Sequence, residues 1–243
     1  MILQMTEGHK AHNLSDRYNY IDTNTVVENL VSNGYYMTQA ISTKPRSKDP
    51  RTVKHFVRMR HNYDASVNTK DVFPEIVIVN SHDGTSSLRL LSGLFRMVCS
   101  NGLVTGSIDN SISITHRNDR WLEASAEAAY ITICRARESA RRTELFKAKM
   151  LHSLDQYSFA DRVSREIYNG QISAQALLQT RRPEDEEKNL WNTFNKVQEN
   201  IMRGGLSTVD ANNKIRRTRA VRGANSNIAI NTKRWDIAEE YLV

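Results

Sequence analysis

The sequence predicts an α+β protein, with an antiparallel, β-rich N-terminal half followed by a helical C-terminal half. Before residue 119, short segments rich in β-branched and aromatic residues alternate with turn dipeptides such as Asp83-Gly84 and Asn101-Gly102. After residue 119, apolar residues recur at three- and four-residue spacing, which is typical of helices with one buried face. We therefore expect an N-terminal arm at residues 1–22, a β-rich core at 23–118 and a helical region at 119–243.

The core is expected to begin with a helix over residues 23–33. Thr23 or Thr25 can cap its N-terminus, and Gly34 follows at the position where helices commonly end. Strands are expected next at residues 35–43, 52–62, 74–80, 87–91, 94–99 and 111–116. The apolar run within residues 87–99 also fits a helix, so both assignments stay open there.

The C-terminal half contains one long helical pattern and several shorter ones. Leu122, Ala126, Ala129 and Ile133 recur at a spacing that places them on one helix face. Helices are expected at residues 119–157, 159–168, 173–178, 183–202 and 232–242. The polar and basic stretch near residues 207–227 is expected to be a loop.

The overall charge favours an anionic partner. The formal net charge is +7 at pH 7, and lysine and arginine gain free energy by releasing counterions from phosphates. A merely solvated basic surface is the alternative. Cys99 and Cys134 lie in apolar surroundings and are expected to be buried free thiols. No apolar stretch approaches the ~20 residues that cross a bilayer, and residues 1–10 do not resemble a signal peptide, so we expect a cytoplasmic location in the host cell and no membrane partner.

A first basic cluster surrounds the second expected strand. Its cations are Lys44, Arg46, Lys48, Arg51, Lys54, Arg58 and Arg60. The alternation of a strand places Lys54, Phe56, Arg58 and Arg60 on one face of the sheet. Such a face suits a single-stranded nucleic acid, because the cations meet phosphates and a base stacks on the Phe56 ring. The alternative is a solvated strand with Phe56 buried in the core.

A second basic cluster lies near the C-terminus. Its members are Arg203, Lys214, Arg216, Arg217, Arg219 and Arg222. Glycines and asparagines separate these cations, as in flexible segments that bind phosphate through paired guanidinium hydrogen bonds. We predict nucleic-acid binding here; a disordered segment without a ligand is the alternative.

The sequence contains no pattern that requires catalysis. His82 and Asp83 are adjacent within a turn and have no evident nucleophile, so a structural role for Asp83 in the turn is favoured. The sequence shows no metal-ligand spacing, no phosphate-binding glycine-lysine box and no dinucleotide fingerprint. We expect no catalytic residue, no metal and no cofactor. A metal-dependent nuclease, with ligands drawn from Asp64, Asp71, Glu75 and Asp83, is the lesser alternative.

Three motifs resemble a known family. They are Asn80-Ser-His-Asp-Gly84 with residues 96–103, residues 191–200 leading to Arg203-Gly-Gly205, and Arg216-Arg-Thr-Arg219 followed by Asn231 and Trp235. They resemble phage- and plasmid-borne proteins grouped as a domain of unknown function, over most of the chain from about Asn24. The resemblance implies an early gene of a mobile element and supplies no catalytic residues.

A second likeness concerns the order of elements. A short helix ending at Asn33-Gly34-Tyr35, then strands, then a long helix is similar to the annealing core of the eukaryotic recombination mediator. That likeness implies a curved sheet on a helix and assembly into rings. Our leading hypothesis is a non-enzymatic protein that binds single-stranded DNA or another nucleic acid, in its finer form an annealing or recombination protein that forms homo-oligomers. The alternative is an anti-defence protein that binds and inhibits a host immunity complex.

Overall fold

The computed structural model describes residues 11, 14–42, 53–66, 72–96, 111–209, 214–221 and 223–242. The chain divides into two compact units, residues 1–97 with 109–138 and residues 98–108 with 139–243. We call them the first and the second unit. The division falls within the long helix α3 (Trp121–Ala148), after Glu138 rather than at residue 119.

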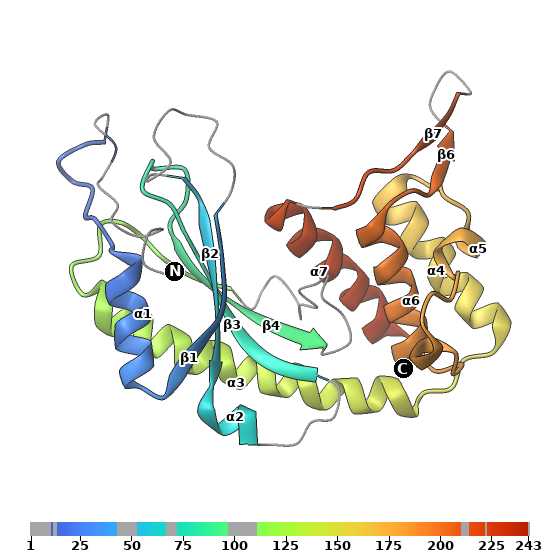
Figure 1. The fold of residues 1–243 in the computed structure, drawn as a ribbon, viewed down its shortest axis with the longest axis horizontal. Helices are drawn as coiled ribbons and strands as arrows, with labels where there is room; N and C mark the ends of the chain where they lie inside the picture. Colours follow the sequence, from blue (N-terminus) through green and yellow to red (C-terminus); the bar gives the residue numbers. More distant parts are fainter. Residues whose placement is uncertain are drawn as a thin grey trace. The chain divides into compact units, whose positions relative to one another are not determined.

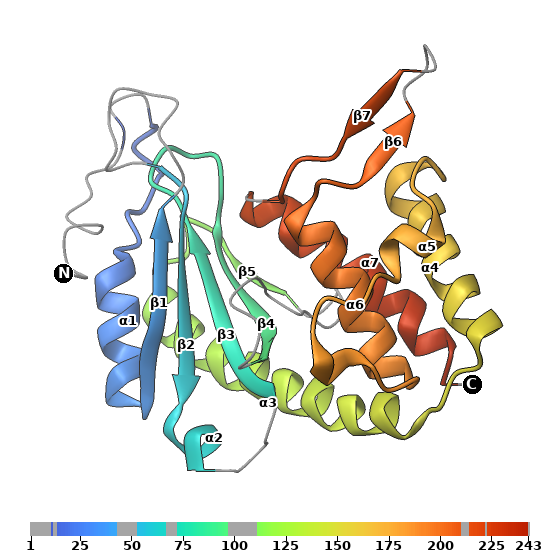
Figure 2. The same ribbon diagram turned by 45° about the vertical axis from the view of Figure 1, so that its right-hand side comes forward.

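The first unit is built on an antiparallel sheet of five strands in the order β1-β2-β3-β4-β5 (Figure 2). The strands are β1 (Tyr35–Ser42), β2 (His55–His61), β3 (Val72–Asn80), β4 (Leu88–Arg96) and β5 (Ile112–Ile114). A short helix, α2 (Asn62–Ser66), follows β2. The predicted antiparallel N-terminal half is confirmed. The sequence fits either a helix or strands over residues 87–99. The described part of this segment is one continuous strand, β4.

Helix α1 (Thr23–Ser32) lies close to its predicted bounds, but its cap is Asp22. The Asp22 carboxylate accepts hydrogen bonds from the backbone N–H groups of Asn24 and Thr25, each 3.2 Å long. The predicted cap by Thr23 or Thr25 is therefore wrong, and Thr23 instead bonds to His55. Gly34 ends the helix region with φ +86, a conformation that L side chains rarely adopt.

Helix α1 and the N-terminal part of α3 pack on one face of the sheet. The core there consists of Ile21, Val26, Leu30, Tyr35, Val57, Met59, Ile76, Ile78, Leu88, Leu90, Ile114, Ala128, Ala129, Ile133 and Ala136. Alanines on α3 allow its backbone to approach the sheet closely. Cys134 follows the buried Ile133 but is exposed, because successive residues of a helix point in different directions. Its predicted burial is wrong, and Cys99 lies outside the described residues.

The second unit is helical, as predicted (Figure 1). Its elements after α3 are α4 (Ser153–Tyr168), α5 (Ala174–Leu177), a 3₁₀ turn at Pro183–Asp185, α6 (Leu190–Arg203), β6 (Ser207–Val209), β7 (Ile215–Arg217) and α7 (Ala224–Glu240). Its aromatic core joins Phe146 of α3 to Phe194 of α6 and Trp235 of α7, with ring centroids 4.9 to 6.4 Å apart.

Several predicted boundaries in this unit are wrong. The helix predicted over residues 183–202 begins at Leu190, and the helix predicted from residue 232 begins at Ala224. The helix predicted to continue to residue 157 stops at Ala148, because the following segment pairs with the chain before α6. Leu151 N–H donates to the Lys188 carbonyl and Leu190 N–H to the Lys149 carbonyl, both at 2.8 Å. The loop predicted near residues 207–227 contains the β6–β7 pair and the first turn of α7 in its described part. Among the described helices, none combines the length and apolar character needed to span a membrane.

Adjacent residues of α1 provide a test of this core. Leu30 is fully buried, whereas Val31 is 51% exposed. Leu30→Ala should lower the free energy of unfolding by about 2–5 kcal/mol, because it leaves a cavity in the core. Val31→Ala should change it by less than about 0.5 kcal/mol. Urea denaturation followed by circular dichroism measures both, and equal effects would contradict the described packing of α1.

Candidate functional site

The first basic cluster is divided by the structure. Lys44, Arg46, Lys48 and Arg51 lie outside the described residues. Lys54 precedes β2 and is partly exposed. Arg58 and Arg60 lie on β2, on the predicted common face with Phe56, which is the face opposite the core that α1 and α3 cover.

Arg58 and Arg60 share one buried carboxylate. The Arg58 Nε lies 2.8 Å from Glu75 Oε2, and the Arg60 Nη2 lies 2.6 Å from Glu75 Oε1. The Glu75 side chain is fully buried, and the Thr38 hydroxyl donates a further hydrogen bond to it at 3.1 Å. Burial lowers the pKa of Arg58, and the Glu75 carboxylate opposes that shift. Both guanidinium groups are therefore paired with a buried negative charge.

The faces of these two guanidinium groups are covered as well. Arg58 lies over the Phe95 ring, 3.2 Å from its centroid, and Arg60 lies over the Phe73 ring at 3.9 Å. Phe56 pairs in register with Ile41 and Val79 and is only 6% exposed. The Phe56 ring is thus not presented for base stacking, and the alternative of a buried Phe56 is the one observed. This sheet face is an internal ion-pair cluster rather than an open cationic surface.

The second basic cluster is also divided. Arg222 lies outside the described residues. Arg203 ends α6 and pairs with Glu199 at 2.8 Å, and Glu199 pairs with Arg182 at 2.9 Å. Because the Glu199 side chain is 4% exposed, Arg203 serves a mostly buried carboxylate.

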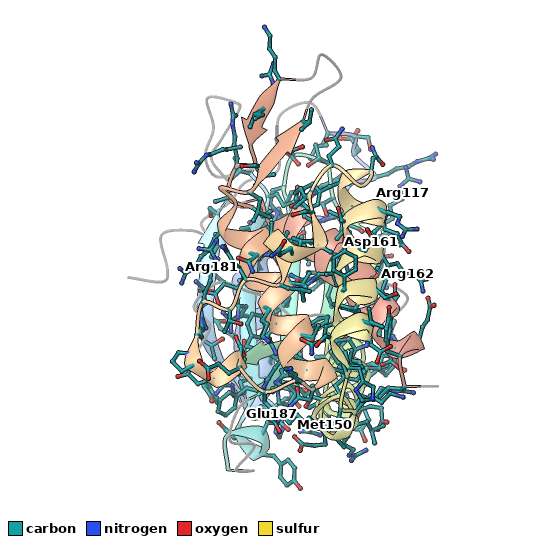
Figure 3. All side chains as sticks on the ribbon, turned by 90° about the vertical axis from the view of Figure 1, so that its right-hand side faces the viewer. Arg117, Met150, Asp161, Arg162, Arg181 and Glu187 are labelled. Atoms are coloured by element: carbon teal, nitrogen blue, oxygen red, sulfur yellow. The ribbon has the colours of Figure 1, made fainter. Side chains whose placement is uncertain are left out.

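The remaining cations of this cluster lie on a two-stranded ribbon. We call β6 and β7 the basic ribbon; it carries the exposed residues Lys214, Arg216, Arg217 and, just after β7, Arg219. Figure 3 draws the described side chains as sticks, with these two strands at the top of the view. These four cations are exposed, whereas Arg58, Arg60 and Arg203 pair with carboxylates that are at most 4% exposed.

The backbone geometry at the base of the basic ribbon explains why two glycines precede it. Gly204 has φ +66, and a Cβ there would lie 2.5 Å from the carbonyl carbon of Arg219. Gly205 N–H donates to the Thr218 carbonyl at 2.8 Å, and Thr218 N–H donates to the Leu206 carbonyl at 2.9 Å. The pairing therefore starts directly after α6, since glycine permits both the positive φ and the close backbone approach.

A second polar site, which the sequence analysis missed, is buried in the first unit. We call Thr23, His55, Asn80, His82 and His116 the histidine network; each is at most 7% exposed. The Asn80 amide donates to the Thr23 hydroxyl at 3.0 Å, and that hydroxyl lies 2.7 Å from His55 Nε2. The His116 Nε2 lies 3.1 Å from Asn80 Oδ1. Hydrogen bonds thus link Thr23, Asn80 and the two histidines His55 and His116 into one chain, and their spacing in the sequence gives no signal of it.

His82 differs from the other two histidines. Neither of its ring nitrogens has a hydrogen-bond partner among the described residues. Its ring packs against Tyr20 and His55, with centroids 4.6 and 5.2 Å apart. Burial lowers its pKa to about 4, and the neighbouring His55 and His116 contribute in the same direction. Burial also lowers the pKa of His55 and of His116.

The predicted structural role of Asp83 is confirmed. Its Oδ1 accepts hydrogen bonds from the Thr85 N–H at 3.0 Å and the Thr85 hydroxyl at 2.6 Å. Burial raises the pKa of Asp83, but these hydrogen bonds outweigh that effect and hold it below its usual value. Asp83 therefore closes the turn before β4 through its own side chain.

The carboxylates considered for a nuclease have separate partners. Asp64 binds Arg137 through two hydrogen bonds of 2.8 and 3.0 Å, Glu75 binds the two arginines of β2, and Asp83 binds Thr85. Asp71 lies outside the described residues. Within the part of the chain that the structure describes, no three His, Cys, Asp or Glu side chains are grouped to hold a metal ion.

The antiparallel sheet covered by helices on one face, together with the helical second unit, defines the class: an α+β protein with a buried histidine network and an exposed basic ribbon. The chain belongs to the family described as "Domain of unknown function (DUF932)", which matches residues 11–235. The resemblance predicted from the motifs is confirmed at the level of this family.

Two relatives come from Escherichia coli (strain K12). The UPF0380 protein YfjQ is 33% identical over 241 residues, covering 96% of this chain and 85% of YfjQ. The UPF0380 protein YafZ is 33% identical over 239 residues, with the same coverage of each chain. No solved structure matches the chain significantly.

The ion-pair cluster on β2 can be tested by one isosteric change. Glu75→Gln leaves two adjacent guanidinium groups without their shared buried charge. The free energy of unfolding should fall by about 3 kcal/mol, at the lower end for breaking a buried pair because both arginines keep some exposure. Glu144→Gln, at a pair whose carboxylate is 69% exposed, should change it by less than about 0.5 kcal/mol. Chemical denaturation measures both, and a Glu75 variant as stable as the control would refute the assignment.

The histidine network predicts acid sensitivity. In the unfolded chain histidines titrate near 6.5, whereas folded His82 stays neutral down to about 4. As the pH falls from about 6.5 toward 4, the unfolded state gains protons that the folded state does not, so the free energy of unfolding decreases. His82→Phe should make this decrease shallower, while Leu154→Ala, at an 83% exposed site without a titratable group, should leave it unchanged. Urea denaturation across this pH range measures the slope, and a His82 variant with the original slope would contradict the prediction.

Proposed function

We propose that this protein binds nucleic acid, with a preference for single strands, through the basic ribbon. The observation that carries the proposal is the exposure of Lys214, Arg216, Arg217 and Arg219 on a two-stranded ribbon. Two-stranded ribbons and flexible basic segments are both used to contact nucleic acid, because guanidinium groups form paired hydrogen bonds with phosphate oxygens.

The other described arginines of the two basic clusters are less suited to binding a phosphate than those of the basic ribbon. Arg58, Arg60 and Arg203 each pair with a carboxylate that is at most 4% exposed. Their charge is therefore largely compensated within the protein, and a phosphate would have to displace that carboxylate. On the basic ribbon the cations are exposed to solvent, so a phosphate can reach them and release counterions.

The surrounding sequence favours the same surface. Between residues 204 and 222 the acidic residue is Asp210, whereas the basic residues are Lys214, Arg216, Arg217, Arg219 and Arg222. The net charge of +7 adds a long-range attraction toward a polyanion. Strand annealing, recombination and self-association are finer forms of this proposal.

A charge-matched pair of variants tests the proposal. Arg217→Ala with Arg219→Ala should weaken binding of a fluorescein-labelled oligothymidylate about tenfold or more at 0.1 M NaCl. The slope of log affinity against log salt should become shallower by about 1.4, since each lost single-strand phosphate contact contributes about 0.7. Fluorescence anisotropy between 50 and 200 mM NaCl measures both quantities.

The control removes the same charge elsewhere. Arg117→Ala with Arg120→Ala changes two exposed arginines of the first unit and should leave affinity nearly unchanged. Equal losses in both double variants would show that only net charge matters and would remove the basic ribbon from the proposal. Absence of binding by the unmodified protein at 50 mM NaCl would overturn the proposed function itself.

A further inference from the structure

The basic ribbon also carries an exposed apolar pair. Ile215 is 77% exposed and Val209 is 46% exposed. The two residues face each other directly across the ribbon, as cross-strand partners. Lys214 precedes Ile215 and Arg216 follows it, so the pair is surrounded by cations. The ribbon thus combines two kinds of surface, one suited to phosphate and one to an apolar group.

The conformation of the ribbon does not explain why both side chains are apolar. β-Branched residues favour strands and cross-strand contact, but threonine satisfies the same backbone preference with a hydroxyl that water can solvate. Apolar surface left in water forgoes about 25 cal/mol per Å² that burial would contribute. The pair is therefore available to gain free energy when a ligand covers it.

The position of the apolar pair relative to the arginines indicates which kind of ligand fits this surface. Side chains alternate along a strand, so Ile215 and Arg217 lie on one face of the basic ribbon, together with Val209 and Ser207. A ligand crossing this face meets an apolar contact and a guanidinium group in succession. In nucleic acid these would be a base and a phosphate.

The accessibility of the bases decides between single and double strands. In a duplex the base faces are stacked inside the helix, whereas in a single strand they can be unstacked and contacted by side chains. Aliphatic side chains have no favourable partner among phosphate oxygens. An apolar pair beside cations therefore suits a strand with accessible bases.

We infer that Val209 and Ile215 contact the bases of single-stranded nucleic acid while Arg217 and its cationic neighbours contact its phosphates. This inference rests on the proposed function, because it assigns the base contact within the same surface. An anionic lipid surface also offers negative charge beside apolar groups, and its binding is one of the outcomes tested below.

The test separates the contribution of the bases to affinity from that of the phosphates. Anisotropy is measured with three labelled probes of equal length: an oligothymidylate, an abasic strand with the same phosphates, and a duplex. The unmodified protein should bind the oligothymidylate about tenfold more tightly than the abasic strand. Val209→Thr with Ile215→Thr keeps both residues β-branched and should abolish this difference, without altering the salt slope or the affinity for the abasic strand and the duplex.

A matched control excludes a general effect of the substitution. Ile41→Thr changes a 47% exposed, β-branched residue on β1 of the first unit and should leave all three affinities unchanged. Thermal unfolding by circular dichroism verifies that each variant is folded.

The outcomes distinguish the inference from the proposed function. Equal affinity of the unmodified protein for the oligothymidylate and the abasic strand would overturn the base contact and leave the phosphate contact intact. Binding to none of the probes would overturn the proposed function. If the threonine variant binds the oligothymidylate normally but loses binding to phosphatidylserine-containing vesicles that the unmodified protein binds, the pair is a lipid contact and the inference is wrong.

Discussion

The arrangement of the first unit depends on the side-chain amide of Asn80, at the end of β3. This amide is fully buried and donates to the Ile21 carbonyl and the Thr23 hydroxyl, at 3.1 and 3.0 Å. Its oxygen accepts from the Ser81 N–H at 2.9 Å and lies 3.1 Å from His116 Nε2. Displacing any of these segments would leave buried polar groups without partners, which costs about 1–3 kcal/mol each. The start of α1, the end of β3 and the chain after β5 are thereby fixed together.

Buried charged groups have the same requirement for a partner. The carboxylates of Asp64, Glu75 and Glu199 are nearly or fully buried, and each is held by at least one arginine. A buried carboxylate requires such a partner, because transfer of an isolated charge from water is very unfavourable. These arginines therefore serve the fold, and the net charge alone does not reveal which cations remain for a ligand. The exposed cations of the basic ribbon are the ones for which we propose binding.

The proposed binding surface would divide nucleic-acid recognition between two kinds of side chain. Cations would supply affinity through counterion release, and such a contribution carries no information about the bases. The apolar pair of Val209 and Ile215 would supply the distinction between a strand with accessible bases and a duplex. The buried histidine network lies in the first unit, where burial lowers the pKa of His82 to about 4.

The amino-acid sequence predicts the α+β class, helix α1, strand β3 and most of the helical content, because these depend on local periodicity and on residues such as Gly34. It also singled out the basic residues of the ribbon and the turn role of Asp83. The tertiary structure is needed to show that Arg58 and Arg60 pair with Glu75 and that Phe56 is buried. It is also needed to show that His55 and His116 are joined through Thr23 and Asn80. Alternation along a strand gives the face on which a side chain lies. The partner it finds there depends on strand register and on contacts between residues far apart in the chain, which no local pattern encodes.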